Sequence, residues 1–165
     1  MFYLSDRDLV KALKDADVRG VTIQILLDAN KDAFGREKNG IPNRPVAHEL
    51  MRHTTGNTTI RWCVTAGEQC HSKMLLTATD TTTELLLGSA NFTRRNLDNY
   101  NLETNIRLID TGTSSAIQAA TDYFNEQWTN ADGRVYSTSY DTYGESHLGK
   151  RIWYRIGEFT GMSHY

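Results

Sequence analysis

The sequence predicts an α/β fold in which a mixed β-sheet is flanked by helices on both faces. Apolar residues change along the chain from helical spacing to short continuous runs, which indicates alternating helices and strands. The expected order begins as β-α-β-α and continues as a series of strands followed by a helix, and this order places helices against a sheet. With 165 residues, of which 39% are hydrophobic, the chain is long enough to bury the core of one such fold.

The first helix is predicted to begin at Ser5 and to end at Gly20. A serine N-cap accepts a hydrogen bond from a free backbone amide, and Asp6 and Asp8 would suit the positive end of the helix dipole. Residues 1–4 are expected to be the end of a preceding strand. The apolar residues at helical spacing are Leu9, Val10, Leu13 and Ala16.

A strand, a loop and a second helix are expected next. Residues 21–27 form an apolar run that predicts a buried strand. Residues 28–42 form a charged, glycine-containing loop of the kind that carries binding groups. Asn43 is expected to cap a helix that ends near Thr54, and Pro45 is tolerated in the first turn of such a helix.

The second half of the chain is predicted to be richer in strands, at residues 58–63, 71–77, 84–87 and 102–109. The second and third of these strands are expected to pair as a hairpin through the polar turn at 79–82. Apolar residues at helical spacing predict a helix over 114–128, and a last helix is expected from Tyr143 to Phe159.

Residues 1–130 are expected to form one domain with a truncated first strand, and residues 131–165 a C-terminal extension. The chain has no run of 18 apolar residues, so no segment is expected to cross a bilayer. A soluble domain is therefore expected, either cytoplasmic or peripheral to a membrane, and the sequence leaves the compartment open.

The charge and the two cysteines narrow the range of partners and cofactors. The net charge is −2 and no stretch is dominated by lysine and arginine, so nucleic acid is a less favoured partner. Two cysteines do not make a disulfide framework, so Cys63 and Cys70 are expected to be reduced thiols in preference to a bridge between them, which remains the alternative. Their spacing from each other and from His71 is not that of an ordinary zinc site, so no metal is expected.

The residues that suggest chemistry lie at the open end of the predicted hairpin, opposite its turn. His71 and Lys73 are two residues apart on one strand and would project from the same face. Gly88, Ser89 and Asn91 follow the other strand, on a turn where backbone can approach a ligand closely. Each pattern alone is commonly a surface pair or a simple turn. Together they bring one nucleophile and several donors to one point, which suits a phosphoryl group.

The segments 70–73 (Cys-His-Ser-Lys) and 88–93 (Gly-Ser-Ala-Asn-Phe-Thr) resemble the His-Lys-Asp motif of the phospholipase D superfamily. The resemblance runs from the first helix to Trp128 and is closest to the C-terminal half of bacterial two-motif phospholipase D-like proteins. It extends to the loop segments 28–35 and 39–45. It implies a phospholipase D-like fold in which this chain is one half of a pseudo-twofold pair, with residues 1–130 as the catalytic half-domain.

The resemblance also implies roles for individual residues in a phosphodiesterase that cleaves or transfers phospholipid headgroups. His71 would be either the nucleophile that forms a phosphohistidine or the acid that protonates the leaving group. Lys73 and Asn91 would hold the nonbridging phosphate oxygens, with Ser89 and Gly88 lining the same pocket. No cofactor is required, because these donors supply the charge stabilisation that a metal would otherwise give.

Glu103 matches the carboxylate that orients the catalytic imidazole in relatives. A nucleophilic imidazole needs an acceptor for its far nitrogen, which favours this role over that of a solvent-facing strand residue. One position departs from the family: the aspartate expected five residues after Lys73 is Ala78. Asp80 is either the displaced aspartate, with a structural role, or a turn residue.

The single motif implies that the site is completed from outside this chain, by a missing N-terminal half or by a homodimer mate. The other histidines have no H-x-K companion and are His48, His53, His147 and His164. Two alternatives to the phospholipid enzyme remain open. One is a homodimeric nuclease with the same chemistry, and the other is a catalytically silent half-domain that scaffolds a partner.

Two further groups of residues have two interpretations each. The cations of the long loop either hold a lipid phosphate or headgroup rim, or form a solvated surface; they are Lys31, Arg36, Lys38 and Arg44. The segment 150–156 mixes cations and aromatic residues and either touches a membrane surface or packs on its own domain, and we favour packing. The family resemblance and the lack of a basic stripe favour a phospholipid over DNA.

Overall fold

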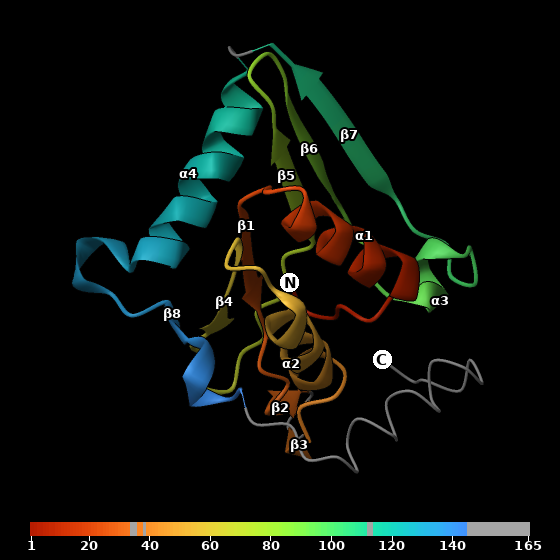
Figure 1. Cartoon of the computed structure of the whole chain (residues 1–165). Coiled ribbons are helices and arrows are strands. Elements are labelled where there is room, and N and C mark those ends of the chain that lie inside the picture. Colours follow the sequence, from red (N-terminus) through yellow and green to blue (C-terminus); the bar gives the residue numbers. More distant parts are fainter. Residues whose placement is uncertain (34–35, 38, 112–113, 145–165) are drawn as a thin grey trace.

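The computed structural model describes residues 1–33, 36–37, 39–111 and 114–144 (Figure 1). The α-helices of this part are α1 (Arg7–Val18), α2 (Asn43–His53), α3 (Arg94–Leu97) and α4 (Ser115–Thr129). The strands are β1 (Ile23–Leu27), β2 (Asp32–Ala33), β3 (Arg36–Glu37), β4 (Thr58–Cys63), β5 (Met74–Ala78), β6 (Thr83–Gly88), β7 (Asn105–Asp110) and β8 (Ser137–Ser139). Short 3₁₀ turns follow α4 and β8, at Ala131–Gly133 and Tyr140–Thr142. None of the described helices has both the length and the apolarity needed to span a membrane.

The α/β class is confirmed, but the strands that we expected in one mixed sheet are divided between two three-stranded sheets and a small hairpin. One sheet has the order β1-β4-β8, with β1 and β4 parallel and β8 antiparallel. The other sheet is the antiparallel β5-β6-β7 meander, and β2 pairs with β3. In the described residues β1 and β5 are each an edge strand, and an apolar cavity of about 500 Å³ lies between them.

The amino-terminal residues connect the two sheets. The backbone of Met1 accepts a hydrogen bond from the amide of Asp28, just after β1, at 2.9 Å. Leu4 forms a parallel bridge with Phe92, which follows β6. Of residues 1–4, which were expected to end a strand, only Leu4 forms a β-bridge.

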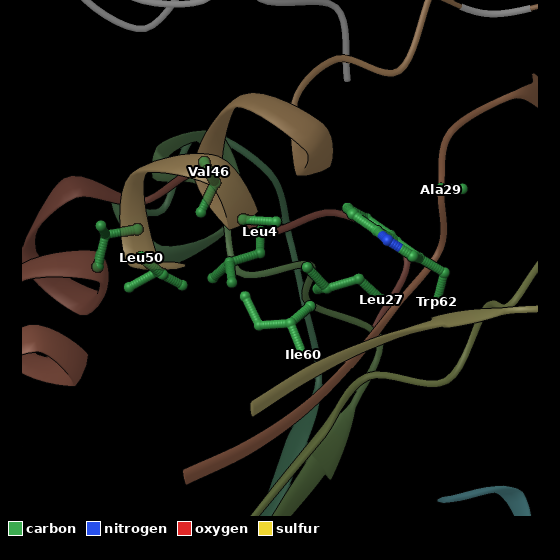
Figure 2. Close-up of a cluster of buried hydrophobic side chains, with 9 residues drawn as sticks. Leu4, Leu27, Ala29, Val46, Leu50, Ile60 and Trp62 are labelled. Atoms are coloured by element: carbon green, nitrogen blue, oxygen red, sulfur yellow. The ribbon is translucent and has the colours of Figure 1, made fainter. Parts of the chain in front are cut away.

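The core lies between α2, α1 and the β1-β4 sheet (Figure 2). Its fully buried members come from each of these elements and include Val10, Leu27, Val46, Ile60 and Trp62. The Trp62 indole N–H donates to the carbonyl of Tyr140 at 2.7 Å, which satisfies the one polar atom of this side chain. The segment after β8 is thereby fastened to the sheet.

Both predicted helix caps are wrong by one residue, for tertiary reasons. Asp6, not Ser5, caps α1, and its carboxylate accepts from the Leu9 amide at 2.8 Å. Ser5 remains extended because its amide donates to the Phe92 carbonyl. Asn43 is the first residue of α2 and not its cap. Its buried side chain instead accepts from the Leu4 amide at 2.8 Å and donates to three backbone carbonyls, which holds the amino-terminal segment in place.

Other boundaries follow the predictions to different degrees. β4 and α4 lie where they were expected, and Ser114 caps α4. The short helix α3 and the strand β8 were not predicted, because their segments are polar and carry little periodicity. Of the helix predicted from Tyr143 to Phe159, Tyr143 and Gly144 are not helical, and the remainder lies outside the described residues.

Glu49 of α2 connects this helix to α1 through a partly buried ionic contact. It accepts from both terminal nitrogens of Arg7, each at 2.8 Å, and from the ammonium of Lys14. Burial alone would raise the pKa of Glu49, but the hydrogen bonds from Arg7 and Lys14 outweigh burial and lower this pKa from 4.5 to about 2.

Replacing Glu49 with Gln is expected to reduce the free energy of unfolding at pH 7 by about 1–2 kcal/mol, a value that allows for solvent screening. The folded-state pKa is lowered, so the stabilisation is full above pH 4.5 and disappears as the pH falls toward about 2. Urea unfolding at several pH values measures both effects. The exposed carboxylate Asp15 supplies the control: Asp15→Asn should change stability by less than about 0.5 kcal/mol. A Glu49→Gln difference that persists undiminished at pH 2 would contradict this account.

Candidate active site

The predicted histidine and lysine are brought together, although not by strand geometry. β5 begins at Met74, so His71 and Lys73 precede the strand and are not its first residues. The Lys73 ammonium instead lies 3.0 Å from Nδ1 of His71 and donates to the His71 backbone carbonyl at 2.7 Å. Lys73 is buried, whereas His71 is exposed. The buried ammonium therefore holds an accessible imidazole.

Asp28 and Phe2 position this segment from the core side. A carboxylate oxygen of Asp28, directly after β1, accepts from the Cys70 amide at 2.9 Å. The Phe2 ring centroid lies 4.9 Å from that of His71, and the Lys73 ammonium lies 5.5 Å from the same Phe2 ring. Neither residue was predicted. The position of Asp28, a carboxylate at the end of a buried strand, was the signal that could have identified it.

Cys63 and Cys70 form a disulfide, so the prediction of two reduced thiols is wrong. β4 ends at Cys63, and the chain turns back so that the two Cα atoms are 6.2 Å apart, a separation that a disulfide can bridge. The spacing of two cysteines in a sequence does not reveal such a turn. The bond ties the residue next to His71 to the β1-β4-β8 sheet.

The Gly88-Ser89 turn lies beside the histidine, as expected. The Gly88 amide donates to the Lys73 carbonyl at 3.2 Å, and the Ser89 amide donates to the Thr104 carbonyl at 3.0 Å. Glycine is needed here for a reason different from the predicted approach of a ligand. A Cβ on Gly88 would lie 2.3 Å from the Thr104 carbonyl oxygen and 2.3 Å from Oδ1 of Asn105. The backbone of Gly88 therefore lies against the chain segment that precedes β7, and not against a ligand.

Gly88→Ala should therefore destabilise the protein by about 1–3 kcal/mol, because the new methyl overlaps backbone that cannot rotate away. Thermal unfolding followed by circular dichroism measures the loss. Thr77→Ala, at an exposed position of the same hairpin, is the control and should leave the melting temperature nearly unchanged. An unchanged melting temperature for Gly88→Ala would show that the β6-β7 contact is not as close as described.

Glu103 lies at the site but its hydrogen bonds differ from those predicted. Its carboxylate accepts from the Ser89 hydroxyl and from the Asn96 side-chain amide. Among the described contacts His71 is paired with Lys73 and not with Glu103. The negative charge of Glu103 nevertheless acts on the site, because it raises the pKa of Lys73 against the lowering effect of burial. Asn96 belongs to the unpredicted helix α3 and could not be inferred from spacing.

Asn91 and Asp80 have different surroundings. The side-chain oxygen of Asn91 is buried and has no hydrogen-bond partner among the described residues. Such an atom is uncommon in proteins and is often found at functional sites. Asp80 is exposed in the β5-β6 turn, at the end of the hairpin opposite to Gly88. The structure therefore does not bring Asp80 to the histidine.

The electrostatic surroundings favour a neutral imidazole. Burial lowers the pKa of His71, the ammonium of Lys73 lowers it further, and the carboxylate of Asp28 opposes both. Burial also lowers the pKa of Lys73, which Glu103 opposes. An imidazole with a lowered pKa is uncharged near neutral pH and keeps a lone pair for nucleophilic attack.

The imidazole opens onto a cavity of about 580 Å³. Its polar lining comes from His71, Ser72, Lys73 and Ser89, together with the backbone of Gly88. Its apolar lining comes from Met74, Leu87, Ala120 and Tyr123. Within the described part of the chain, no three His, Cys, Asp or Glu side chains are grouped so that they could hold a metal ion.

None of the loop cations or other histidines that the structure describes lines the cavity at His71. The Lys31 ammonium donates to the Thr65 carbonyl at 2.7 Å, and the Arg44 guanidinium donates to the Ala29 carbonyl at 2.8 Å. Both cations thus hold neighbouring loops, and the side chains of Arg36 and Lys38 lie outside the description. His48 and His53 lie on α2 as expected. His147, His164 and the segment 150–156 are outside the described residues.

Two comparisons with known proteins bear on this site. A search of curated proteins finds no significant match. The family model described as the PLD-like domain of cardiolipin synthase matches residues 1–128, which include His71, Lys73, Gly88, Ser89, Asn91 and Glu103. The matched segment is most of the chain and contains every element from α1 to the greater part of α4. The chain therefore belongs to the phospholipase D superfamily, whose characteristic chemistry is that of phosphodiesterases.

Proposed function

We propose that this chain supplies one of the two His-Lys half-sites of an enzyme that cleaves or transfers phospholipid headgroups. The observation that carries the proposal is the exposed His71 imidazole, which a buried Lys73 holds at 3.0 Å at the mouth of a cavity. A nucleophile beside an ammonium and a hydroxyl fits a phosphoryl group, whose oxygens gain stabilisation from both donors. The Asn91 side-chain oxygen, which has no hydrogen-bond partner among the described residues, supports the same function, because rotation of the amide presents an N–H₂ donor in place of this oxygen.

The contact between Lys73 and His71 describes the resting state of this proposal. An ammonium that donates to Nδ1 leaves the proton of a neutral imidazole on Nε2, which then cannot attack. Attack through Nε2 requires the proton on Nδ1 and an acceptor beside it. An entering phosphate offers Lys73 a stronger, charge-assisted partner than the imidazole. Nδ1 is then free to donate to a carboxylate. Glu103, whose charge acts on Lys73, is our candidate for this acceptor, and Asp28, whose charge acts on His71 itself, is the alternative.

The proposed reaction has two displacements. The lone pair of Nε2 attacks phosphorus, an N–P bond forms, and the bond to the leaving-group oxygen breaks as that oxygen takes a proton from the second histidine. A water or an alcohol then attacks phosphorus, gives its proton to the same second histidine, and the N–P bond breaks. A covalent intermediate in this way divides one difficult displacement into two easier ones. If His71 is instead the acid, the second histidine forms the N–P bond and the steps are otherwise the same.

The second histidine comes from outside this His-Lys motif, because the described residues place no other histidine at the cavity. A second copy of the chain or an N-terminal half of a longer protein would supply it. The net charge of −2 supports a phospholipid over a nucleic acid, whose binding is driven by neutralisation of many phosphates. The family description, which concerns cardiolipin synthase, supports the same choice of substrate.

The test compares phosphatidylcholine vesicles with plasmid DNA as substrates of the full chain, alone and with any N-terminal half that accompanies it. We expect released headgroup and a mass increase on His71 or on its counterpart, seen by mass spectrometry of protein quenched with denaturant at alkaline pH, where the N–P bond survives. Light scattering decides between a homodimer and a monomer of 18.7 kDa that needs a separate half. Cleavage of DNA alone would favour the nuclease. Cleavage of neither substrate by the complete assembly would leave only the scaffolding role and overturn the proposal.

A further inference from the structure

Three apolar side chains form a row across the β5-β6-β7 sheet beside the histidine. Met74 of β5 is directly opposite Leu87 of β6, and Leu87 is directly opposite Ile106 of β7. Directly paired residues of antiparallel strands project from the same face, so the three side chains are neighbours. Leu87 and Ile106 are exposed, at 37% and 54%. An exposed apolar row in the interior of a meander indicates a surface that another apolar group covers.

Met74 and Leu87, two of the three side chains in this row, form one wall of a cavity whose other wall is the helix α4. Ala120 and Tyr123 of α4 line the same 580 Å³ space as Met74 and Leu87, which places the row on the sheet face that α4 covers. The Tyr123 hydroxyl lies 3.0 Å from the Ser72 hydroxyl, so its ring is held across the end of the cavity next to His71. A space of this volume, with apolar walls on two sides and a few polar groups at one end, has the character of a ligand pocket.

The two ends of the cavity differ in chemistry. His71, Lys73 and Ser89 form the polar end, and Leu87, Ala120 and Tyr123 lie directly beside them. We propose that the cavity between β6 and α4 binds the apolar part of an amphiphilic phosphodiester whose phosphate lies at His71 and Lys73. This inference rests on the proposed function and adds that specificity for the apolar group comes from this chain. Leu87, Ala120 and Tyr123 line the cavity and are then specificity-determining residues. Ile106, which pairs with Leu87, extends the apolar row beyond this lining.

The β7 strand offers a matched pair of variants for the test. Ile106 and Ile109 are 54% and 55% exposed but lie three residues apart, so they project from opposite faces of the sheet. Ile106→Ser removes an apolar group from the cavity face, and Ile109→Ser removes the same group from the other face. Ala120→Trp fills the cavity from the side of α4. Circular dichroism and melting curves establish that all three variants are folded.

Calorimetric titration of the full chain with dihexanoyl phosphatidic acid and with glycerol phosphate measures the preference for acyl groups. We expect the wild type to bind the acylated ligand roughly tenfold or more tightly, because each buried methylene favours binding. Ile106→Ser should lower this preference by roughly threefold or more, and Ala120→Trp should abolish it. Ile106→Ser should weaken binding of the acylated ligand more than binding of glycerol phosphate. Ile109→Ser should bind both ligands as the wild type does.

Equal binding of the two ligands by the wild type would overturn the inference and leave the proposed function intact. Binding of neither ligand would count against the phosphate site, and therefore against the proposed function itself. In a third outcome, a second copy of the chain, and not a ligand, covers the apolar row. If Ile106→Ser converts a dimer to a monomer in light scattering and does not change the ligand preference, the row is a protein interface and the inference is wrong.

Discussion

Replacing His71 with Asn is expected to abolish phosphodiester cleavage, with kcat reduced roughly 10³-fold or more. Asparagine preserves the approximate size and polarity of the side chain but cannot form a covalent bond to phosphorus or donate a proton to a leaving oxygen. Both roles that His71 can take are lost together. Because His71 is exposed and its ring is held by Lys73, the change should leave the fold intact. Assays on a soluble phosphodiester and melting curves on the same samples measure the two effects separately.

The control for this substitution is another histidine. His53 is exposed at the end of α2, where its Nδ1 lies 2.8 Å from the Glu49 carbonyl. His53→Asn should therefore leave kcat within the error of the assay. Full activity in the His71→Asn variant of the complete assembly would disprove the assignment of His71. Equal losses in both variants would indicate a general effect of histidine removal on the fold.

The pH dependence of the wild-type enzyme supplies a second measurement on His71. A nucleophilic imidazole must be neutral, so activity is lost when the pH falls below its pKa. Burial and the charge of Lys73 lower the pKa of His71 from its usual 6.5, with Asp28 opposing them. The acid limb of kcat/KM is therefore expected below pH 6.5. An acid limb well above this pH would show that the imidazole is stabilised in its charged form. A general acid requires the charged form, whereas a nucleophile requires the neutral one.

The sequence carried enough information to predict the class of the fold and the grouping of His71, Lys73 and Ser89 around one cavity, because both depend on local patterns. The catalytic roles of these residues stay a prediction. The β-branched and aromatic residues before Cys63 define β4, and the small residues at the end of β6 define the Gly88-Ser89 turn. The partners of polar side chains were much harder to predict. Ser5, Asn43 and Glu103 all have hydrogen bonds to segments far away in the sequence or to an unpredicted helix. These hydrogen-bond partners depend on which segments of the chain meet in three dimensions.

Replacing Lys73 with Met is expected to reduce kcat by about 10²–10³-fold, the usual cost of removing one preorganised donor to a developing negative charge. The ammonium is held 3.0 Å from the imidazole and is buried, so its charge is little screened by water. Methionine fills a similar volume and keeps the contact with Phe2, which protects the packing. Lys73→Arg should not restore the rate, because a planar guanidinium does not replace a compact ammonium in this position.

A shift of the pH profile distinguishes this role from a structural one. The charge of Lys73 lowers the pKa of His71, so its removal should raise the pKa and move the acid limb to higher pH. A residue that only supported the fold would lower the rate at all pH values without moving the limb. Lys11→Met, at an exposed position of α1, is the control and should change neither the rate nor the profile. A large loss of rate in Lys73→Met with an unmoved acid limb would show that the ammonium does not act on the imidazole. The 3.0 Å contact would then have to be explained by packing alone.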